Sequence, residues 1–197
     1  GAQFNQNYQY LRPQLYSEYD LMDQDAIIAS ALDILADEST LKNDMGEVIQ
    51  IRSANEDIQK ILYNLFYDVL NIEFNLWMWI RQMCKYGDFF LKLEIAEKYG
   101  VYNVIPYTAY HIERQEAYDP KNPSSIRYRY TPDGMDNLSS GMYPVPGAGG
   151  GNLENENGIF FDNYEMAHFR LISDVNYLPY GRAYIEPARK LFKQYVL

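Results

Sequence analysis

Apolar residues recur with helical spacing in several parts of the chain. The first pattern covers residues 19–40 and predicts a helix whose acidic run 18–25 is a solvated start, favoured by the positive end of the helix dipole. The second pattern covers residues 53–70. It begins with Ser53 and Glu56 in the spacing of a capping box, which predicts where this helix starts.

The third helical pattern, residues 73–86, is apolar almost all round, which is typical of a buried helix. Gly87 follows where a left-handed C-terminal cap is expected. Cys84 lies on the apolar face and is expected to be a core residue rather than a nucleophile. From residue 89 to 95 the apolar period changes to two, which predicts a strand.

Further strands are predicted from alternation and from turn-forming residues such as "DPKNP". They cover residues 46–53, 99–119, 124–132 and 165–173. Helices combined with a mostly antiparallel sheet indicate the α+β class.

The segment from Asp133 to Gly158 has no apolar period but contains seven glycines and two prolines. It is predicted to be a flexible glycine-rich loop, with an ordered binding loop as the alternative. Its "GAGGGN" lacks the Lys-Ser/Thr of a phosphate-binding loop. We therefore expect a flexible lead-in at 1–16, an α+β domain at 17–181, and the start of a further helix at 182–197.

The closing helical pattern is the most basic part of the chain. Its apolar stripe comprises Ala188, Leu191, Phe192, Tyr195 and Val196, and its basic side comprises Arg189, Lys190 and Lys193. Two interpretations of the basic side stay open. It is either a solvated face near a helix C-terminus, or it packs against an acidic neighbour.

Charge and composition exclude several classes of protein. The formal charge is −10, with +3 in the last 16 residues and therefore −13 in the first 181. A surface this negative repels phosphate backbones, so tight nucleic-acid binding is not expected. A single cysteine excludes an internal disulfide, and no apolar run approaches the roughly 18 residues of a membrane span.

Residues that could carry chemistry are few. His111 and His168 both lie in predicted strands, without the ligand spacing of a zinc site, and are expected to be hydrogen-bonded strand residues. We therefore assign no catalytic residue, no cofactor and no metal ligand.

Two long blocks of the sequence resemble a known family. They are "WMWIRQMCKYGDFFLKLEIAEKYGVYNV" and "NYEMAHFRLISDVNYLPYGRAYIEPARKLFKQ", within residues 72–105 and 163–197. In wording, order and spacing these blocks resemble the portal vertex protein of T4-like tailed bacteriophages, including the cyanophage type. The stretches "DILADESTLKNDMGEVIQIRS" and "LFYDVLNIEFN" fit the same family.

The resemblance implies a structural protein without catalytic chemistry. It implies the N-terminal, wing-like part of a subunit whose stem helix begins in the last residues and is truncated here. The full-length subunit would form a dodecameric homo-oligomer at the capsid vertex of the virion, assembled in the host cytoplasm. Its partners would be the terminase, scaffold or capsid proteins and neck proteins, and DNA would pass through without specific binding.

The resemblance also suggests which residues form a subunit interface or a hinge. These candidates are Tyr177, Pro179, Tyr180, Gly181, Arg182, Arg189, Lys190 and Lys193. The chain alone is expected to be monomeric or weakly associated, because most ring contacts of the family involve other parts of the subunit.

Two other classes of function remain as alternatives. One is a small-molecule enzyme that uses acidic residues in a tyrosine-lined cleft. The other is a partner-binding module that uses an exposed sheet edge.

Overall fold

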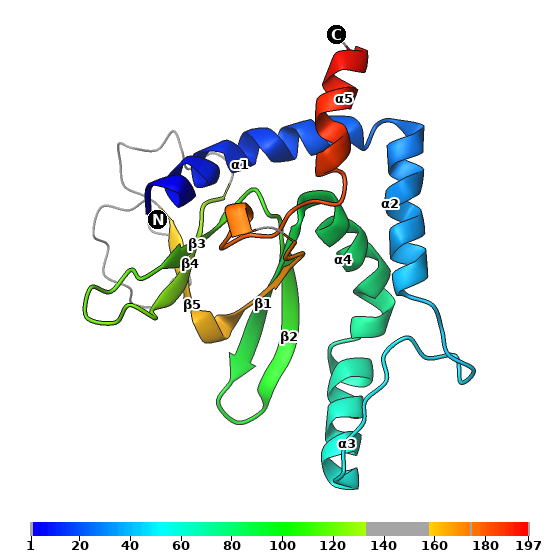
Figure 1. Cartoon of the computed structure of the whole chain (residues 1–197). Coiled ribbons are helices and arrows are strands. Elements are labelled where there is room, and N and C mark those ends of the chain that lie inside the picture. The colour runs from blue at the N-terminus through cyan, green and yellow to red at the C-terminus, as the bar shows by residue number, and fades with distance from the viewer. Residues whose placement is uncertain (1, 133–157, 174, 197) are drawn as a thin grey trace.

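The computed structural model describes the backbone of residues 2–132, 158–173 and 175–196, and the side chains within these ranges from residue 12 to residue 195. In these ranges the chain folds into five α-helices and two three-stranded antiparallel sheets (Figure 1). The predicted α+β class is confirmed. The predicted glycine-rich loop lies outside the described residues up to 157, so the structure leaves that prediction open.

The first sheet is built on a hairpin of β1 (Asp88–Ala96) and β2 (Gly100–Tyr107). On the other side of β1, strand β6 (Met166–Arg170) pairs antiparallel, which gives the order β2–β1–β6. This register places Phe90 opposite His168. The second sheet has the order β3–β4–β5 and consists of β3 (Ile112–Glu116), β4 (Ile126–Tyr130) and β5 (Ile159–Asp162).

Most of the predicted strands are present, with three differences. Residues 46–53 form no strand, because the N–H groups of Val48 and Ile49 donate to the carboxylate of Glu73 instead of to a neighbouring strand. His111 lies in the turn before β3 rather than in the strand. Strand β5 was not predicted, since its four residues are too few to establish an alternating pattern.

Helix α1 (Ala2–Met22) corrects two predictions at the start of the chain. The expected lead-in over residues 1–16 is helical from Ala2. The pattern over 19–40 is two helices rather than one, because the carboxylate of Asp25 accepts the N–H groups of Ile27 and Ile28 and so starts a second helix, α2 (Ala26–Ser39).

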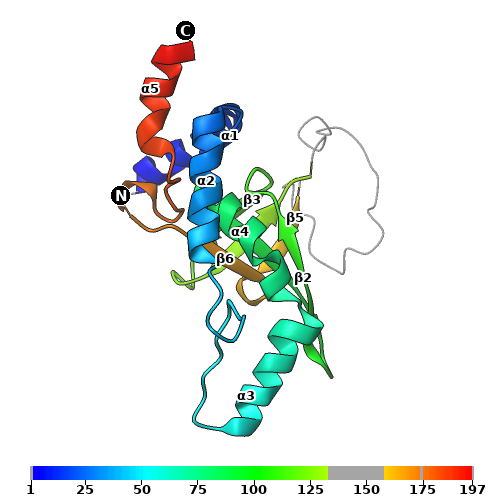
Figure 2. The same cartoon turned by 90° about the vertical axis from the view of Figure 1, so that its right-hand side faces the viewer.

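The next helical stretch begins at α3 (Glu56–Tyr63), continues into the π-helical η1 (Asn64–Val69), and has no buried side chain. Its N-terminal cap is Asn55, which accepts the N–H groups of Asp57 and Ile58. The predicted capping box of Ser53 and Glu56 is therefore wrong. Figures 1 and 2 show α3 at the opposite end of the molecule from the last helix.

Helix α4 (Ile72–Tyr86) ends as predicted at Gly87, which adopts φ 83° and caps the helix through an N–H bond to the Met83 carbonyl. The helix packs against α2 and β1 and buries Trp79 and Cys84. Phe74 is nevertheless 81% exposed, so the prediction of a helix buried all round is wrong. Three short elements complete the chain: the 3-10 turns η2 (Asn163–Glu165) and η3 (Val175–Tyr177), and the helix α5 (Glu186–Val196).

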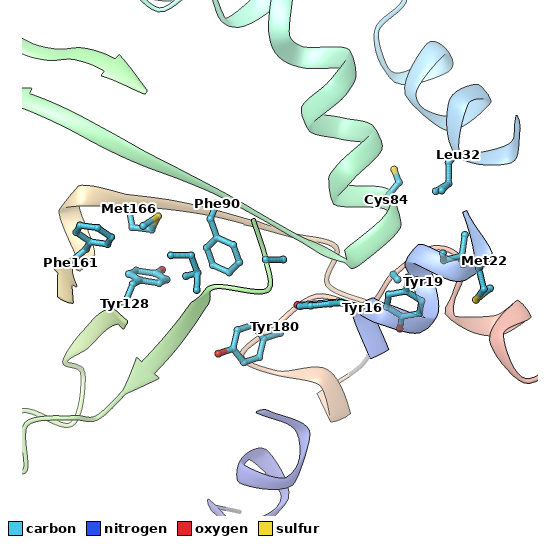
Figure 3. Packing of buried hydrophobic residues seen from close by; sticks show 14 residues of the cluster. Tyr16, Tyr19, Met22, Leu32, Cys84, Phe90, Tyr128, Phe161, Met166 and Tyr180 are labelled. Carbon is cyan, nitrogen blue, oxygen red and sulfur yellow. The ribbon is translucent and has the colours of Figure 1, made fainter. Parts of the chain in front are cut away.

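The main core joins α1, the two sheets and the segment before α5. Figure 3 shows Tyr16 of α1, Phe90 of β1, Tyr128 of β4 and Tyr180 packed as one cluster. All four are at most 1% exposed. Three of them are tyrosines whose hydroxyl groups reach polar partners, so this core is tied together by hydrogen bonds as well as by apolar contact.

Candidate functional site at the base of the last helix

The segment 177–186, which leads into α5, crosses the end of α4 at a close approach of two backbones. A Cβ atom on Gly181 would lie 2.0 Å from the carbonyl oxygen of Gly87, and one on Gly87 would lie 2.7 Å from the Ala183 nitrogen. Leu171 N–H donates to the Gly87 carbonyl over 2.9 Å. Only glycine fits at both positions of this crossing. We call the crossing of Gly87 and Gly181, together with the adjacent Asp88, the junction.

Asp88 is the polar centre of the junction and is 1% exposed. Its Oδ1 accepts the N–H of Gly181 over 2.9 Å and the Nε2–H of His168 over 2.7 Å. Its Oδ2 accepts the hydroxyl of Tyr16 over 3.4 Å. One carboxylate therefore holds together the start of β1, the middle of β6, helix α1 and the segment before α5.

His168 is the neutral donor in this arrangement. Burial lowers its pKa below 6.5, and the hydrogen bond to Asp88 offsets only part of that effect. Its Nδ1 has no hydrogen-bond partner, which agrees with a proton on Nε2 and none on Nδ1. His168 is thus a hydrogen-bonded strand residue, as predicted.

Arg12 places a positive charge against the same cluster while only 4% exposed. Its guanidinium lies 3.5 Å from the centroid of the Tyr180 ring, a cation–π stack. It donates to the Tyr16 hydroxyl over 2.8–2.9 Å and to the carbonyl oxygens of Ala109 and Ile112 over 3.3 Å. Tyr16 thereby bridges a buried cation and the buried Asp88 carboxylate.

The basic side of α5 meets its acidic neighbour within the same chain. Arg189 and Lys193 bind the two carboxylate oxygens of Glu18 on α1, over 2.7 and 2.5 Å. Arg189 also pairs with Glu186 over 2.8 Å, and the Tyr19 hydroxyl donates to Glu186. Burial would raise the pKa of Glu18, but the hydrogen bonds from Lys193 and Arg189 hold it below 4.5.

The rest of the acidic run fixes α1 to α4. Asp23 binds Arg81 and Lys85, both over 2.8 Å, and Asp20 binds Lys85 over 2.6 Å. Lys85 is only 8% exposed, so these carboxylates neutralise a cation that would otherwise be buried alone. The prediction that the run 18–25 is a solvated helix start is therefore wrong.

The sequence candidates fall into two groups around the junction. Tyr180 and Gly181 are in its buried centre. Pro179 precedes them and follows a cis Leu178–Pro179 peptide bond. Its carbonyl oxygen accepts a hydrogen bond from Arg170 Nη1 over 2.5 Å. At the edge of the junction, Tyr177 and Arg182 are half-buried and contact one another, with the Arg182 guanidinium 5.7 Å from the ring. Of the basic residues, Arg189 and Lys193 bind Glu18 on α1, whereas Lys190 points to another side of the helix and is exposed.

Sequence reasoning missed Asp88, Arg12 and Glu18. A signal existed for Asp88, because it is an acidic residue between a capping glycine and the apolar "FFL" of β1. No signal existed for Arg12, which precedes Pro13 in a segment that reads as polar.

A second region bears on the enzyme alternative. A shallow hollow of about 360 Å³ beside β1 and β2 is lined by residues that include Tyr102, Tyr164, Glu94 and Glu165. Glu165 accepts the N–H of Asp162 in a capping box, and Glu94 accepts the side-chain amide of Asn103 over 2.8 Å. These carboxylates are thus engaged in local structure, which does not favour a catalytic pair.

Among the residues that the structure describes, no three His, Cys, Asp or Glu side chains gather as a metal site. No helix in the described ranges has the length and apolarity needed to cross a membrane.

Comparison with known proteins agrees with the resemblance seen in the sequence. A search of curated proteins gives no significant match. The family model described as "Bacteriophage T4-like portal protein (Gp20)" matches residues 12–197. The match begins at Arg12 and includes the junction, α5 and every strand. The chain therefore belongs to the T4-like bacteriophage portal protein family.

Proposed function

We propose that this chain is the wing-like part of a portal subunit that forms a conduit for the viral genome at one capsid vertex. Family membership itself implies a virion component that assembles as an oligomeric ring and a structural rather than enzymatic role. The proposal adds a dodecameric ring through which DNA enters during packaging and leaves during ejection. It also adds docking of the terminase during packaging and of neck and tail proteins afterwards.

The observation that carries this proposal is the family match over residues 12–197. The charge of −10 supports it, because DNA slides past an acidic wall without adhering to it. The junction supports a hinge or anchor role for Tyr180 and Gly181, since they fix the direction in which α5 leaves the domain. We propose that α5 is the beginning of the stem helix.

The decisive experiment is expression of a longer portal subunit that contains these 197 residues, followed by electron microscopy. Twelve-fold rings with a central channel are expected. Particles without a channel, or no rings at all, would contradict the proposed function.

A second measurement concerns the 197-residue chain alone, which we propose is monomeric or weakly associated. Multi-angle light scattering is expected to give a mass near the 23.1 kDa of one chain. A stable dodecamer of this chain would show instead that its own surfaces are sufficient for ring assembly.

A further inference from the structure

Helix α5 presents an apolar stripe to solvent. Tyr184, just before the helix, and Leu191 and Tyr195 within it are 57%, 69% and 85% exposed, and Ala188 between them is exposed as well. These positions follow the spacing i, i+4, i+7, i+11 and form one face. The opposite face is held on α1 by Glu18, so this stripe points away from the domain.

Helix α2 presents a second stripe of the same kind. Ile27 and Ile34 are 81% and 59% exposed, with Ala31 exposed between them. The other face of α2 buries Leu32 and Ala36. In the described part of the chain, therefore, both helices use one face for the core and leave a second apolar face uncovered.

The two stripes are complementary in shape and charge. Each places a small alanine between larger apolar residues, at i+4, where two helix backbones can approach closely. The exposed Lys190 lies on the flank of α5, about 100° round the helix from Leu191, and the α2 stripe continues along the same face to the exposed Glu38. Helix α5 has three basic residues and one acidic residue, a net charge of +2, and α2 has three acidic residues and no basic one, a net charge of −3. Pairing two copies of the same helix would therefore bring like charges together, so the favourable pair is mixed.

We propose that α5 of one copy packs its Tyr184–Tyr195 stripe against the Ile27–Ile34 stripe of α2 on the next copy. This inference rests on the proposed function, because it names one contact by which copies join in a ring. The contact is heterologous, because each copy uses its α5 stripe toward one neighbour and its α2 stripe toward the other. Repeated contacts of this kind form a closed ring when the rotation between successive copies is a whole fraction of a turn. One helix pair is a small interface, which agrees with weak association of the chain alone.

Disulfide crosslinking tests the pairing in the 197-residue chain. In a Cys84→Ala background, one preparation carries Ala31→Cys and a second carries Ala188→Cys. The two are mixed at high concentration under mild oxidation. The mixed dimer is expected to predominate over both symmetric dimers. A statistical mixture of the three dimers, or a majority of either symmetric dimer, would overturn the proposal.

Further variants connect the crosslink to the stripes. Leu191→Asp in the Ala188→Cys chain is expected to lower the yield of mixed dimer about tenfold or more. The control is Ile61→Asp on α3, since Ile61 is 66% exposed against 69% for Leu191. Equal losses in both variants would overturn the proposal. Lys190→Glu should lower the yield as well, and Glu38→Lys in the other chain should restore it.

Failure of this inference is distinguishable from failure of the proposed function. If the longer subunit forms rings but residues 31 and 188 of neighbouring copies do not crosslink within them, the helix pairing is wrong and the ring function stands. If the mixed crosslink forms but the longer subunit gives no rings, the proposed function fails.

Discussion

The junction and the α3–η1 segment show two different ways in which one chain holds its parts. In the junction the backbone, a carboxylate and two aromatic rings are all buried, and each is in contact with several elements. In α3–η1 no side chain is buried. The geometry of the junction is therefore determined by the elements packed around it. The α3–η1 segment is instead a helical stretch that contacts the rest of the domain through partly exposed side chains.

The attachment of α3–η1 depends on hydrogen bonds near the surface. The Tyr67 hydroxyl donates to the Ile49 carbonyl over 2.6 Å and to Glu73 over 2.7 Å, and its ring stacks on Tyr63 at 4.6 Å. The Gln59 amide donates to the Ile51 carbonyl over 2.9 Å. Changes here should therefore cost little global stability, whereas changes in the junction should cost much.

The largest effect is expected from Gly87→Ala. The new Cβ combines a left-handed φ of 83° with backbone atoms at 2.7 Å, so a loss of about 3 kcal/mol or more in the free energy of unfolding is expected. Gly46→Ala is the matched control, with φ 82° but no atom within 4 Å, and should lose only about 1 kcal/mol. Urea unfolding measures both. Similar losses would show that the crossing is not tightly packed.

Asp88→Asn is expected to have the second largest effect. It keeps an acceptor for Gly181 but removes the negative charge near the buried Arg12, which should cost about 3 kcal/mol. The corresponding change in the other region is Glu73→Gln, which weakens the bonds to Val48 and Tyr67 and should cost about 1 kcal/mol or less. If the two losses measured by urea unfolding were reversed in rank, the contrast between the regions would be wrong.

A smaller effect concerns pH. The folded-state pKa of His168 is below 6.5. As pH falls through 6.5, the unfolded chain therefore binds a proton at this histidine while the folded chain does not, and the free energy of unfolding decreases. This one group contributes a slope of at most about 1.4 kcal/mol per pH unit. His168→Gln keeps a donor toward Asp88, and its stability should depend less on pH between 7 and 5. Equal pH profiles for the two proteins would argue against a buried neutral histidine.

The smallest effect is expected from Glu18→Gln, which weakens the link between α1 and α5. Its partners Arg189 and Lys193 are 27% and 46% exposed, so water can solvate them when the Glu18 charge is removed, and the loss should stay below about 1 kcal/mol at pH 7. Because the folded pKa of Glu18 is lowered, the natural chain keeps this contribution above pH 4.5 and loses it as pH falls through the folded pKa. The variant lacks that dependence. Hydrogen exchange of α5 amides measures the link, with Glu97→Gln at an exposed turn as the control.

The sequence pattern was sufficient where the physical cause is local. The end of α4 follows from a glycine that adopts a left-handed conformation, and β1 follows from its alternating apolar residues. The break at Asp25 is local as well, but the continuous apolar pattern around it concealed the cap.

The pattern was insufficient where burial depends on distant segments. Arg12 and Asp88 are charged, and nothing adjacent to them in sequence shows that Tyr16 and Tyr180 will surround them. The sequence shows the apolar faces of both α2 and α3. Periodicity does not indicate, however, whether such a face packs against another element of the same chain or against a second molecule. The same limit explains why the sequence left open whether the basic side of α5 is solvated or packs against an acidic neighbour, which the structure identifies as Glu18.

Helix α1 has a mechanical consequence for the whole domain. At 21 residues it is about 30 Å long, and it is fixed to its neighbours at three levels. Arg12 donates to the Ile112 carbonyl at the start of the second sheet, Glu18 forms an ion pair with Arg189 of α5, and Asp23 forms an ion pair with Lys85 of α4. A load applied along α5 is therefore transmitted through Glu18 to α1, and from α1 to α4 and the second sheet. These three contacts do not involve α3.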